Sequence, residues 1–229
     1  MKESTLVCNF SVVYGAQGFL QWLQENAGNV QVLEMSDIDG TSCYCDPDAQ
    51  REIAKRLGGE LPVLRWIDSG DYHYMSHILA KRETEPFHLM LLDNHPDNQE
   101  PAFSGVLSCG SWVKAMREEN RLLQDILWVG PESSNYVKWI ENRRGERLYI
   151  SLDKDVMSKD WARTDWTQGD YSLEQVEGIL SMAFENMNVV AVDICGELAE
   201  SKGAGAQDNR INFETNTQLY KLITGYVRN

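Results

Sequence analysis

The stretch FHLMLLDNHPDNQ, residues 87–99, determines the fold and locates the site. It opens with the apolar run from His88 to Leu92, which is typical of a strand buried on both faces of a parallel sheet. Pro96 lacks an amide hydrogen, so this strand must end before it. Metal-type ligands follow at alternate positions, where side chains of an extended chain point the same way: Asp93, His95 and Asp97. We therefore expect a ligand cluster at the carboxyl end of a buried strand, where open parallel sheets carry their sites.

A second stretch, RLYISLDKD at residues 147–155, repeats this design. A strand-like run ends at Leu152, and Asp153 and Asp155 follow at the same alternate spacing. Two facing clusters of carboxylates repel each other strongly in a low-dielectric site unless cations lie between them. The four aspartates carry a charge of about −4, which two divalent cations would neutralise. Carboxylates with one or two imidazoles suit Mn²⁺ or Mg²⁺ better than structural zinc.

Length and composition are those of an ordinary globular protein. The 229 residues, 42% of them hydrophobic, suffice for one large α/β domain, and without a convincing linker or repeat we expect a single domain over residues 1–229. No apolar run approaches the roughly 20 residues that span a bilayer, and no signal peptide is evident, so we expect no membrane partner. Five scattered cysteines favour reduced thiols in the cytoplasm over a disulfide framework.

The formal net charge of −14 limits the choice of partners. Nucleic acid is a poor partner for such a surface, because its binding relies on Lys and Arg contacts to phosphate. An acidic field favours a cationic substrate, either a small molecule or a peptide. The sequence leaves the oligomeric state open.

Strand-like and helix-like segments alternate along the chain, which predicts a mostly parallel sheet with helices on both faces. Strands are expected at 5–14, 30–35, 61–67, 125–130 and 189–195. The run 156–170 lacks periodicity and indicates a functional loop. The polar, glycine-containing run 199–212 is expected to be a loop as well, followed by a closing helix over 213–227.

Three motifs in this order resemble the metal motifs of the ureohydrolases, the superfamily of arginase, agmatinase and formiminoglutamase. They are GDYH at 70–73, DNHPD at 93–97 and SLDKD at 151–155. The short chain looks similar to a divergent arginase-like branch, some of whose members hydrolyse arginine side chains within peptides. The resemblance implies a three-layer α/β/α fold with a mostly parallel central sheet, as in arginase.

The resemblance also implies a binuclear Mn²⁺ centre. The ligands of one ion would be His73, Asp93, Asp97 and Asp153. The ligands of the other would be His95, Asp93, Asp153 and Asp155. A water acidified between the ions would attack the trigonal carbon of a guanidinium group. Asp97 would hold this water and pass its proton to the leaving amine, so that the products are urea and an amine.

Around the expected substrate, the chain departs from the pattern of that family. Ser108 stands where arginases carry a proton-shuttle histidine, and Glu197 comes one position late after Asp193. Asp193 and Glu197 are candidates for holding a cationic head group, with a role as loop or cap residues as the alternative. Trp161 and Trp166 are candidates for stacking on a guanidinium, with a role as packing anchors as the alternative.

Other functions of the same fold class compete with this reading. A deacetylase-like enzyme normally keeps one zinc with two Asp and one His, but amide hydrolysis by a binuclear centre stays open. A non-catalytic metal-binding protein would keep the ligands without the chemistry. A phosphodiesterase-like site is disfavoured, because Lys154 is the sole cation beside either cluster and phosphate would require more.

Overall fold

The computed structural model describes residues 4–103, 105–131 and 135–227. Its centre is a seven-stranded sheet with the strand order β2-β1-β4-β9-β8-β5-β7, in which each strand runs parallel to its neighbours. The strands are β1 (Ser4–Asn9), β2 (Asn29–Glu34), β4 (Leu64–Trp66), β5 (Phe87–Leu92), β7 (Leu123–Val129), β8 (Arg147–Asp153) and β9 (Asn188–Cys195). The predicted parallel sheet is therefore confirmed.

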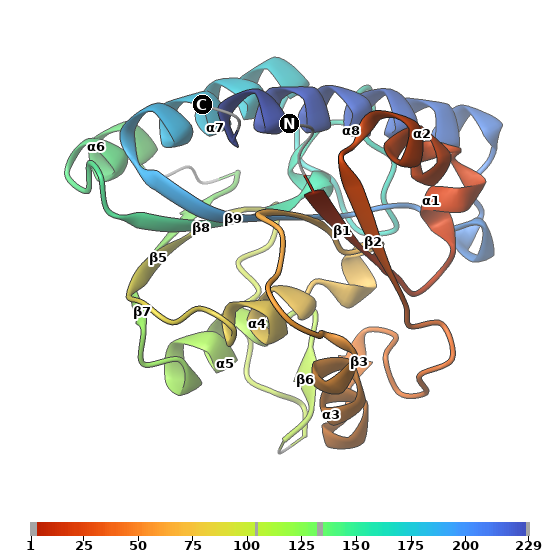
Figure 1. Cartoon of the computed structure of the whole chain (residues 1–229), viewed down its shortest axis with the longest axis horizontal. Coiled ribbons are helices and arrows are strands. Elements are labelled where there is room, and N and C mark those ends of the chain that lie inside the picture. Colours follow the sequence, from red (N-terminus) through yellow and green to blue (C-terminus); the bar gives the residue numbers. More distant parts are fainter. Residues whose placement is uncertain (1–3, 104, 132–134, 228–229) are drawn as a thin grey trace.

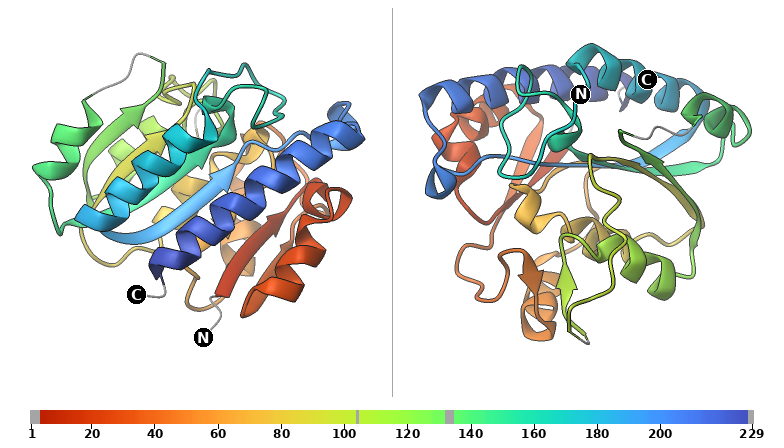
Figure 2. Two further views of the ribbon diagram at one scale, coloured as in Figure 1. Left: turned by 90° about the horizontal axis from the view of Figure 1, so that it is seen from above. Right: turned by 180° about the vertical axis from the view of Figure 1, so that it is seen from behind.

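Helices cover both faces of this sheet (Figure 1). One face carries α1 (Val13–Ala16), α2 (Phe19–Asn26), α6 (Tyr136–Glu141), α7 (Leu173–Asn186) and α8 (Ala206–Val227). The other face carries α3 (Pro47–Arg56), α4 (Met75–Ala80) and α5 (Trp112–Glu119). The view from above in Figure 2 shows α7 and α8 lying across the strands. This is the three-layer α/β/α architecture that the sequence predicts.

Each face of the sheet has its own hydrophobic core, and β5 contributes to both. Met90 and Leu92 pack into the core beneath α7 and α8, whereas Leu89 and Leu91 pack into the core beneath α4 and α5. All four side chains are completely buried. Because successive side chains of a strand point to opposite faces, a strand covered on both sides must be apolar throughout. This explains the uninterrupted apolar run of residues 88–92.

Short elements outside the main sheet surround its carboxyl edge. A two-stranded antiparallel ladder joins β3 (Tyr44–Cys45) to β6 (Leu107–Ser108). Three turns of 3-10 helix follow strands of the main sheet: η1 (Gly70–Tyr72), η2 (Lys154–Val156) and η3 (Glu200–Lys202). In the part of the chain that the structure describes, no helix is long and apolar enough to cross a membrane.

Two expected boundaries differ in the structure. The loop predicted over 199–212 is wrong from residue 206 onward, because α8 already begins at Ala206. The polar residues that suggested a loop make specific contacts there. Asp208 accepts a hydrogen bond from the Gly205 amide, and Asn212 exchanges two hydrogen bonds with the backbone of Arg163. Tertiary contacts thus stabilise helix where local composition predicts a loop.

The strand predicted over 5–14 ends at Asn9. The amides of Phe10 and Ser11 donate to the buried Asp68 carboxylate, at 3.0 and 2.8 Å, instead of to a neighbouring strand. Val12 then adopts a left-handed backbone conformation with a φ of 64°. This conformation is unfavourable for a β-branched residue, and Val12 is 56% exposed, so little packing compensates for it.

We predict that Val12→Gly raises the free energy of unfolding by about 1 kcal/mol, because glycine adopts a positive φ without steric cost. Urea unfolding of both proteins measures the difference. Val137→Gly is the matched control, since Val137 is also exposed but lies within the right-handed helix α6, where glycine should destabilise. A Val12→Gly protein less stable than the wild type would contradict the argument.

Candidate metal centre

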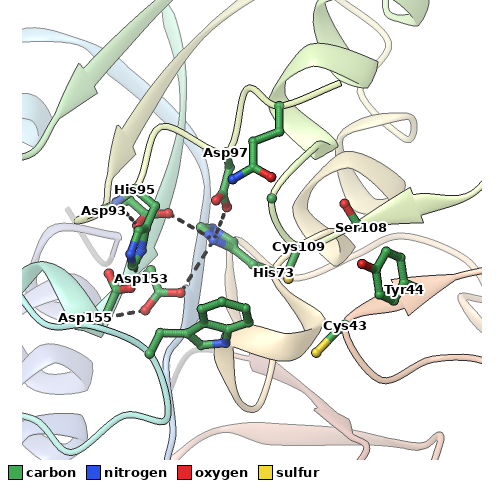
Figure 3. A pocket seen from close by; sticks show the side chains of 14 residues that line it. Cys43, Tyr44, His73, Asp93, His95, Asp97, Ser108, Cys109, Asp153 and Asp155 are labelled. Atoms are coloured by element: carbon green, nitrogen blue, oxygen red, sulfur yellow. Dashed lines mark hydrogen bonds and ion pairs between the residues drawn. The ribbon is translucent and has the colours of Figure 1, made fainter. Parts of the chain in front are cut away.

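The ligands predicted from the sequence all line one cavity at the carboxyl edge of the sheet (Figure 3). The volume of this cavity is about 250 Å³. Its lining includes all six predicted metal ligands: His73, Asp93, His95, Asp97, Asp153 and Asp155. The register of the sheet brings the ligands of β5 and β8 together. Leu92 of β5 lies opposite Leu152 of β8, so the aspartates that follow these residues emerge side by side.

His73 is the centre of a first group of ligands. Its Nδ1 lies 3.2 Å from Asp93 Oδ2, 3.0 Å from Asp97 Oδ2 and 3.5 Å from Asp153 Oδ2. On the other side of the ring, Nε2 lies 2.9 Å from the hydroxyl of Ser151. This hydroxyl fixes the orientation of the imidazole, so that Nδ1 faces the three carboxylates.

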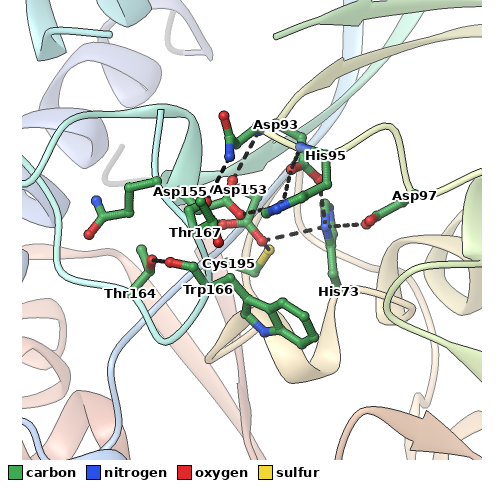
Figure 4. A network of polar contacts seen from close by, with 12 residues as sticks. His73, Asp93, His95, Asp97, Asp153, Asp155, Thr164, Trp166, Thr167 and Cys195 are labelled. Carbon is green, nitrogen blue, oxygen red and sulfur yellow. Dashed lines mark hydrogen bonds and ion pairs between the residues drawn. The ribbon is translucent and has the colours of Figure 1, made fainter. Parts of the chain in front are cut away.

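His95 belongs to a second group, which shares Asp93 with the first (Figure 4). Its Nδ1 lies 2.8 Å from Asp155 Oδ2 and 3.6 Å from Asp93 Oδ1. Asp93 therefore directs one oxygen to each histidine. A carboxylate in this position can bridge two cations.

Turns, rather than extended backbone, make the ligands of each motif converge. The amide of His95 donates to Asp93 Oδ1 at 2.6 Å, and the amide of Asp155 donates to Asp153 Oδ1 at 2.9 Å. In both motifs the first aspartate thus bonds the amide two residues on, which is an Asx turn. The interpretation that alternate positions on an extended chain bring these side chains together is therefore wrong. The strands end just before or at the first aspartate of each motif.

Gly196, directly after β9, leaves the room that this turn requires. Its φ is 88°, a conformation that L side chains rarely adopt. A Cβ atom at this position would collide with Asp153 Oδ1 and with the amide nitrogen of Lys154. A glycine is thus required where β9 approaches the ligand turn.

Cys195 is a potential ligand that sequence reasoning missed. It lies opposite Asp153 in the β8–β9 register, and its thiol donates to Asp153 Oδ2 at 3.2 Å. Together with His73, these residues form a third group of converging metal-type atoms. In the sequence, Cys195 could have been found from its position two residues after Asp193, because residues two apart on a strand lie on the same face.

The carboxylates of this centre are strained electrostatically. Burial raises the pKa of Asp153 to about 6, and the charge of Asp155 adds to the shift. Burial, with the charge of Asp93, raises the pKa of Asp155 to about 7. Burial also raises the pKa of Asp93 and of Asp97. Conversely, hydrogen bonds that the His95 imidazole donates to Asp155 and Asp93 raise the pKa of His95 to about 10.

This donor set fits divalent cations. Asp93 Oδ2 is completely buried and accepts no hydrogen bond from the described residues. An unsatisfied buried acceptor costs about 1–3 kcal/mol, so a cation at this position would stabilise the carboxylate oxygen. Four carboxylates with two imidazoles are hard ligands of the kind that Mn²⁺ and Mg²⁺ prefer.

Of the aromatic candidates for substrate contact, Trp166 lines the cavity and Trp161 does not. The Trp166 ring approaches the His95 ring at 6.3 Å between centroids, and its Nε1 donates to Asp71 Oδ1 at 3.2 Å. Trp161 instead accepts a hydrogen bond at its carbonyl from Thr215 of α8. The Trp161 side chain is 37% exposed, so its role as a substrate contact stays a prediction, whereas its backbone carbonyl attaches the loop to α8.

Asp193 and Glu197 also lie away from the cavity lining. Asp193 accepts a hydrogen bond from the Tyr149 hydroxyl and lies 3.7 Å from Arg65. Glu197 is completely buried and pairs with Lys154. Their charges are paired in the protein interior, so the interpretation of these two carboxylates as head-group contacts is wrong.

Several lining residues were not predicted as site residues: Cys43, Tyr44, Gln99 and Cys109. Cys43, Tyr44 and Cys109 lie in or next to the β3–β6 ladder, whose pairing joins residues more than sixty positions apart. Local patterns cannot reveal such a pairing, because β3 and β6 have two residues each.

No protein-family model matches this chain. An uncharacterized protein of Thermotoga maritima is 26% identical over 202 residues, which are 83% of this chain and 78% of that protein. Among solved structures, proclavaminate amidino hydrolase from Streptomyces clavuligerus is similar, with a TM-score of 0.68 and 13% sequence identity. The match covers 98% of this chain and 92% of that protein's chain.

Two further solved structures show the same likeness. A hypothetical agmatinase from Burkholderia thailandensis has a TM-score of 0.63 at 14% identity, covering 100% of this chain and 88% of its own. Arginase from Bacillus caldovelox has a TM-score of 0.62 at 12% identity, covering 96% and 98%. At such identities the likeness defines the fold. The chain has an arginase-like fold.

A buried ion pair supports the turn that carries two of the ligands. Lys154 is completely buried; its Nζ pairs with Glu197 and donates to Asn216 Oδ1 of α8 at 2.9 Å. Glu197 also accepts from Gln17 at 2.7 Å and from Asn216 at 2.8 Å. Burial lowers the pKa of Lys154, and the attraction of Glu197 opposes this shift. The network attaches the ligand turn to the helical layer.

We predict that Lys154→Met and Glu197→Leu each lower the free energy of unfolding by about 3 kcal/mol, because each leaves one buried charge unpaired. The double variant Lys154→Met/Glu197→Leu should lose less free energy of unfolding than the two single variants together, because it leaves no unpaired charge in the interior. A double-mutant cycle by urea unfolding measures the coupling. Strictly additive losses would show that the two charges do not depend on each other.

His77, one helical turn after His73, has a structural role in α4. Its side chain is buried, and Nε2 lies 3.2 Å from Glu119. Burial lowers the pKa of His77 to about 4; Lys81 adds to this shift and Glu119 opposes it. The unfolded chain therefore binds an extra proton between pH 6.5 and about 4. The contribution of neutral His77 to the free energy of unfolding is therefore fully present above pH 6.5 and is lost as the pH falls from 6.5 to about 4.

We predict that the stability advantage of the wild type over His77→Gln falls by about 2–3 kcal/mol between pH 7 and pH 4. Urea unfolding of both proteins across this range measures it. Taking the difference between them removes the contributions of other titrating groups. An advantage that is independent of pH would contradict a neutral, buried His77.

Proposed function

We propose that this protein is a metal-dependent hydrolase that cleaves a C–N bond of a guanidino group and releases urea and an amine. The observation that carries the proposal is the convergence of two imidazoles and four carboxylates in one cavity. This cavity lies at the carboxyl edge of a sheet with the ureohydrolase fold. The proposed location is the cytoplasm, which the five free thiols support.

The proposed cofactor is a pair of divalent cations, with Mn²⁺ as the first candidate. The residues that would hold one ion are His73, Asp93, Asp97 and Asp153. The residues that would hold the other are His95, Asp93, Asp153 and Asp155. When bound, such ions supply Lewis acidity that makes a water nucleophilic near neutral pH. Cys195, behind Asp153, is too deeply buried to reach a substrate.

Asp97 is the proposed proton carrier. Its Oδ2 accepts a hydrogen bond from Trp112 Nε1 at 2.6 Å, and its side chain lines the cavity. Burial raises the pKa of Asp97, which suits a carboxylate that takes a proton from the attacking water. From the same position it can pass this proton to the leaving amine. Trp112 holds the carboxylate in place during both transfers.

The lining of the cavity favours a cationic substrate without a carboxylate near the guanidino group. None of the fourteen lining residues is Lys or Arg. Trp166 adds an aromatic face on which a guanidinium can stack. The α-carboxylate of free arginine would lie near this acidic wall and would find no Lys or Arg among the lining residues to pair with. We therefore favour an arginine side chain within a peptide, or an agmatine-like amine, over free arginine.

We predict that the Mn²⁺-loaded protein binds about two ions per chain and releases urea from an arginine-containing peptide or agmatine faster than from arginine. Metal analysis and a urea assay measure these quantities. Asp97→Asn should lower kcat at least about 100-fold, because the proton carrier is lost. The exposed Asp160→Asn is the matched control and should retain activity.

Two results would contradict this proposal. The first is a loaded protein that releases no urea from any of the three substrates. The second is Asp97→Asn with wild-type kcat. An acetylated-lysine peptide serves as an additional substrate, and release of acetate from it without urea would indicate an amidohydrolase instead.

A further inference from the structure

The five cysteines fall into two groups according to burial. Cys8, Cys45 and Cys195 are inaccessible, with at most 1% of each exposed. Cys43 and Cys109 are half-buried, and both line the cavity of the metal centre. The two accessible thiols are thus also the two that lie at the cavity wall. The mechanism proposed above uses neither.

The β3–β6 ladder places these two residues opposite each other. Tyr44 pairs with Ser108 and Cys45 with Leu107, so the next antiparallel position joins Cys43 to Cys109. The amide of Cys109 donates to the carbonyl of Cys43 at 3.0 Å. Cys43 lies just before β3 and has a φ of 57°, so the ideal strand spacing does not apply to it. The backbone hydrogen bond by itself keeps the two Cα atoms no more than about 7 Å apart, close to the upper limit of the roughly 4.4–6.8 Å that a disulfide spans.

Both side chains line the same cavity. Cys109, from the segment after β6, lies beside His73, and Cys43, from the segment before β3, lies farther along the wall near Tyr44 (Figure 3). Neither thiol belongs to a group of three or more metal-type atoms that converge within 4.8 Å among the described residues. A metal site made from these two thiols therefore has no support, whereas a bond between them does.

We propose that Cys43 and Cys109 form an intramolecular disulfide across the cavity wall when the folded protein meets a small-molecule disulfide such as oxidised glutathione. In the first step one protein thiol gives up its proton, and the thiolate attacks a sulfur of the oxidant. The S–S bond of the oxidant breaks, and one reduced glutathione leaves. In the second step the other protein thiolate attacks the protein sulfur of the mixed disulfide and releases the second glutathione.

The atoms and electrons of this exchange balance. Two protein thiols lose two electrons and two protons, and one glutathione disulfide becomes two glutathione thiols. Burial raises the pKa of Cys43 to about 11, with the neighbouring Asp71 adding to the shift, and burial also raises the pKa of Cys109. Both groups are thus protonated near neutral pH, so the first step is slow. The second step is favoured by proximity, since the partner thiol is already opposite.

The disulfide would join two segments that shape the cavity. On one side, the carbonyl of Gly110, next to Cys109, accepts the amide of Gln99 at 2.9 Å. On the other side, the hydroxyl of Ser42, next to Cys43, donates to Asp71 Oδ2 at 3.2 Å. The linkage therefore couples the segment after the DNHPD motif to the Asp71 side of the cavity. It is independent of the reaction that the centre catalyses.

The test is a peptide map of the metal-loaded full-length protein after incubation with excess oxidised glutathione. Free thiols are alkylated after unfolding, and the digest is analysed by mass spectrometry without reduction. We expect one linked pair of peptides, Cys43 with Cys109, while Cys8, Cys45 and Cys195 are alkylated. The linked protein should also show a Tm about 5 °C higher than the reduced protein, because the link shortens the unfolded chain.

Single variants separate a bond between the two thiols from modification of each alone. Cys109→Ser should carry glutathione on Cys43 and form no link, and Cys45→Ser should form the same link as the wild type. The proposal is overturned if Cys43 and Cys109 remain free in the wild type under conditions that oxidise a model dithiol. It is also overturned if each carries its own glutathione, or if the link appears only in unfolded protein.

Discussion

The structure depends on the crowding of four carboxylates and two imidazoles at the carboxyl ends of β5 and β8. Such a concentration of buried negative charge opposes folding unless positive charge compensates it. The chain itself offers His73 and His95, whose Nδ1 atoms lie about 3 Å from the nearest carboxylates. Asp93 Oδ2 accepts no hydrogen bond from the described residues although His73 Nδ1 lies 3.2 Å away, so the two imidazoles do not satisfy every carboxylate oxygen. Divalent cations would complete the compensation, so the fold and its proposed cofactor are linked by one electrostatic requirement.

The rest of the molecule holds this unfavourable arrangement in place. The two hydrophobic cores hold β5 and β8 side by side, so the aspartates at their carboxyl ends must stay close together. Ser151 orients His73, Trp112 holds Asp97, and the Lys154–Glu197 pair attaches the second ligand turn to the helices. These supporting groups lie behind the ligands and away from the cavity. The opposite wall of the cavity is formed by the β3–β6 ladder and the segments next to it.

Sequence reasoning was successful where chemistry and local pattern coincide. The apolar runs at 88–92 and 148–152 require burial on both faces, so they predict central parallel strands and, with the alternating helices, the three-layer fold. The ligand motifs follow these strands directly, so their position at the carboxyl edge could also be predicted. Sequence reasoning failed for Asp193 and Glu197, because a charged residue near a strand end can face either the cavity or the interior. The direction depends on partners such as Arg65 and Lys154, which lie far away in the chain.

The sequence by itself therefore determined the architecture and the set of metal-type ligands, since both follow from periodicity and spacing within short segments. Only the tertiary structure decided which residues share the cavity: the β5–β8 register, the place of Cys195 beneath Asp153, and the wall of Trp166, Cys43 and Cys109. These features arise from contacts between segments that are distant along the chain. Such contacts depend on how the whole core packs, and the local propensity of a short segment does not predict them.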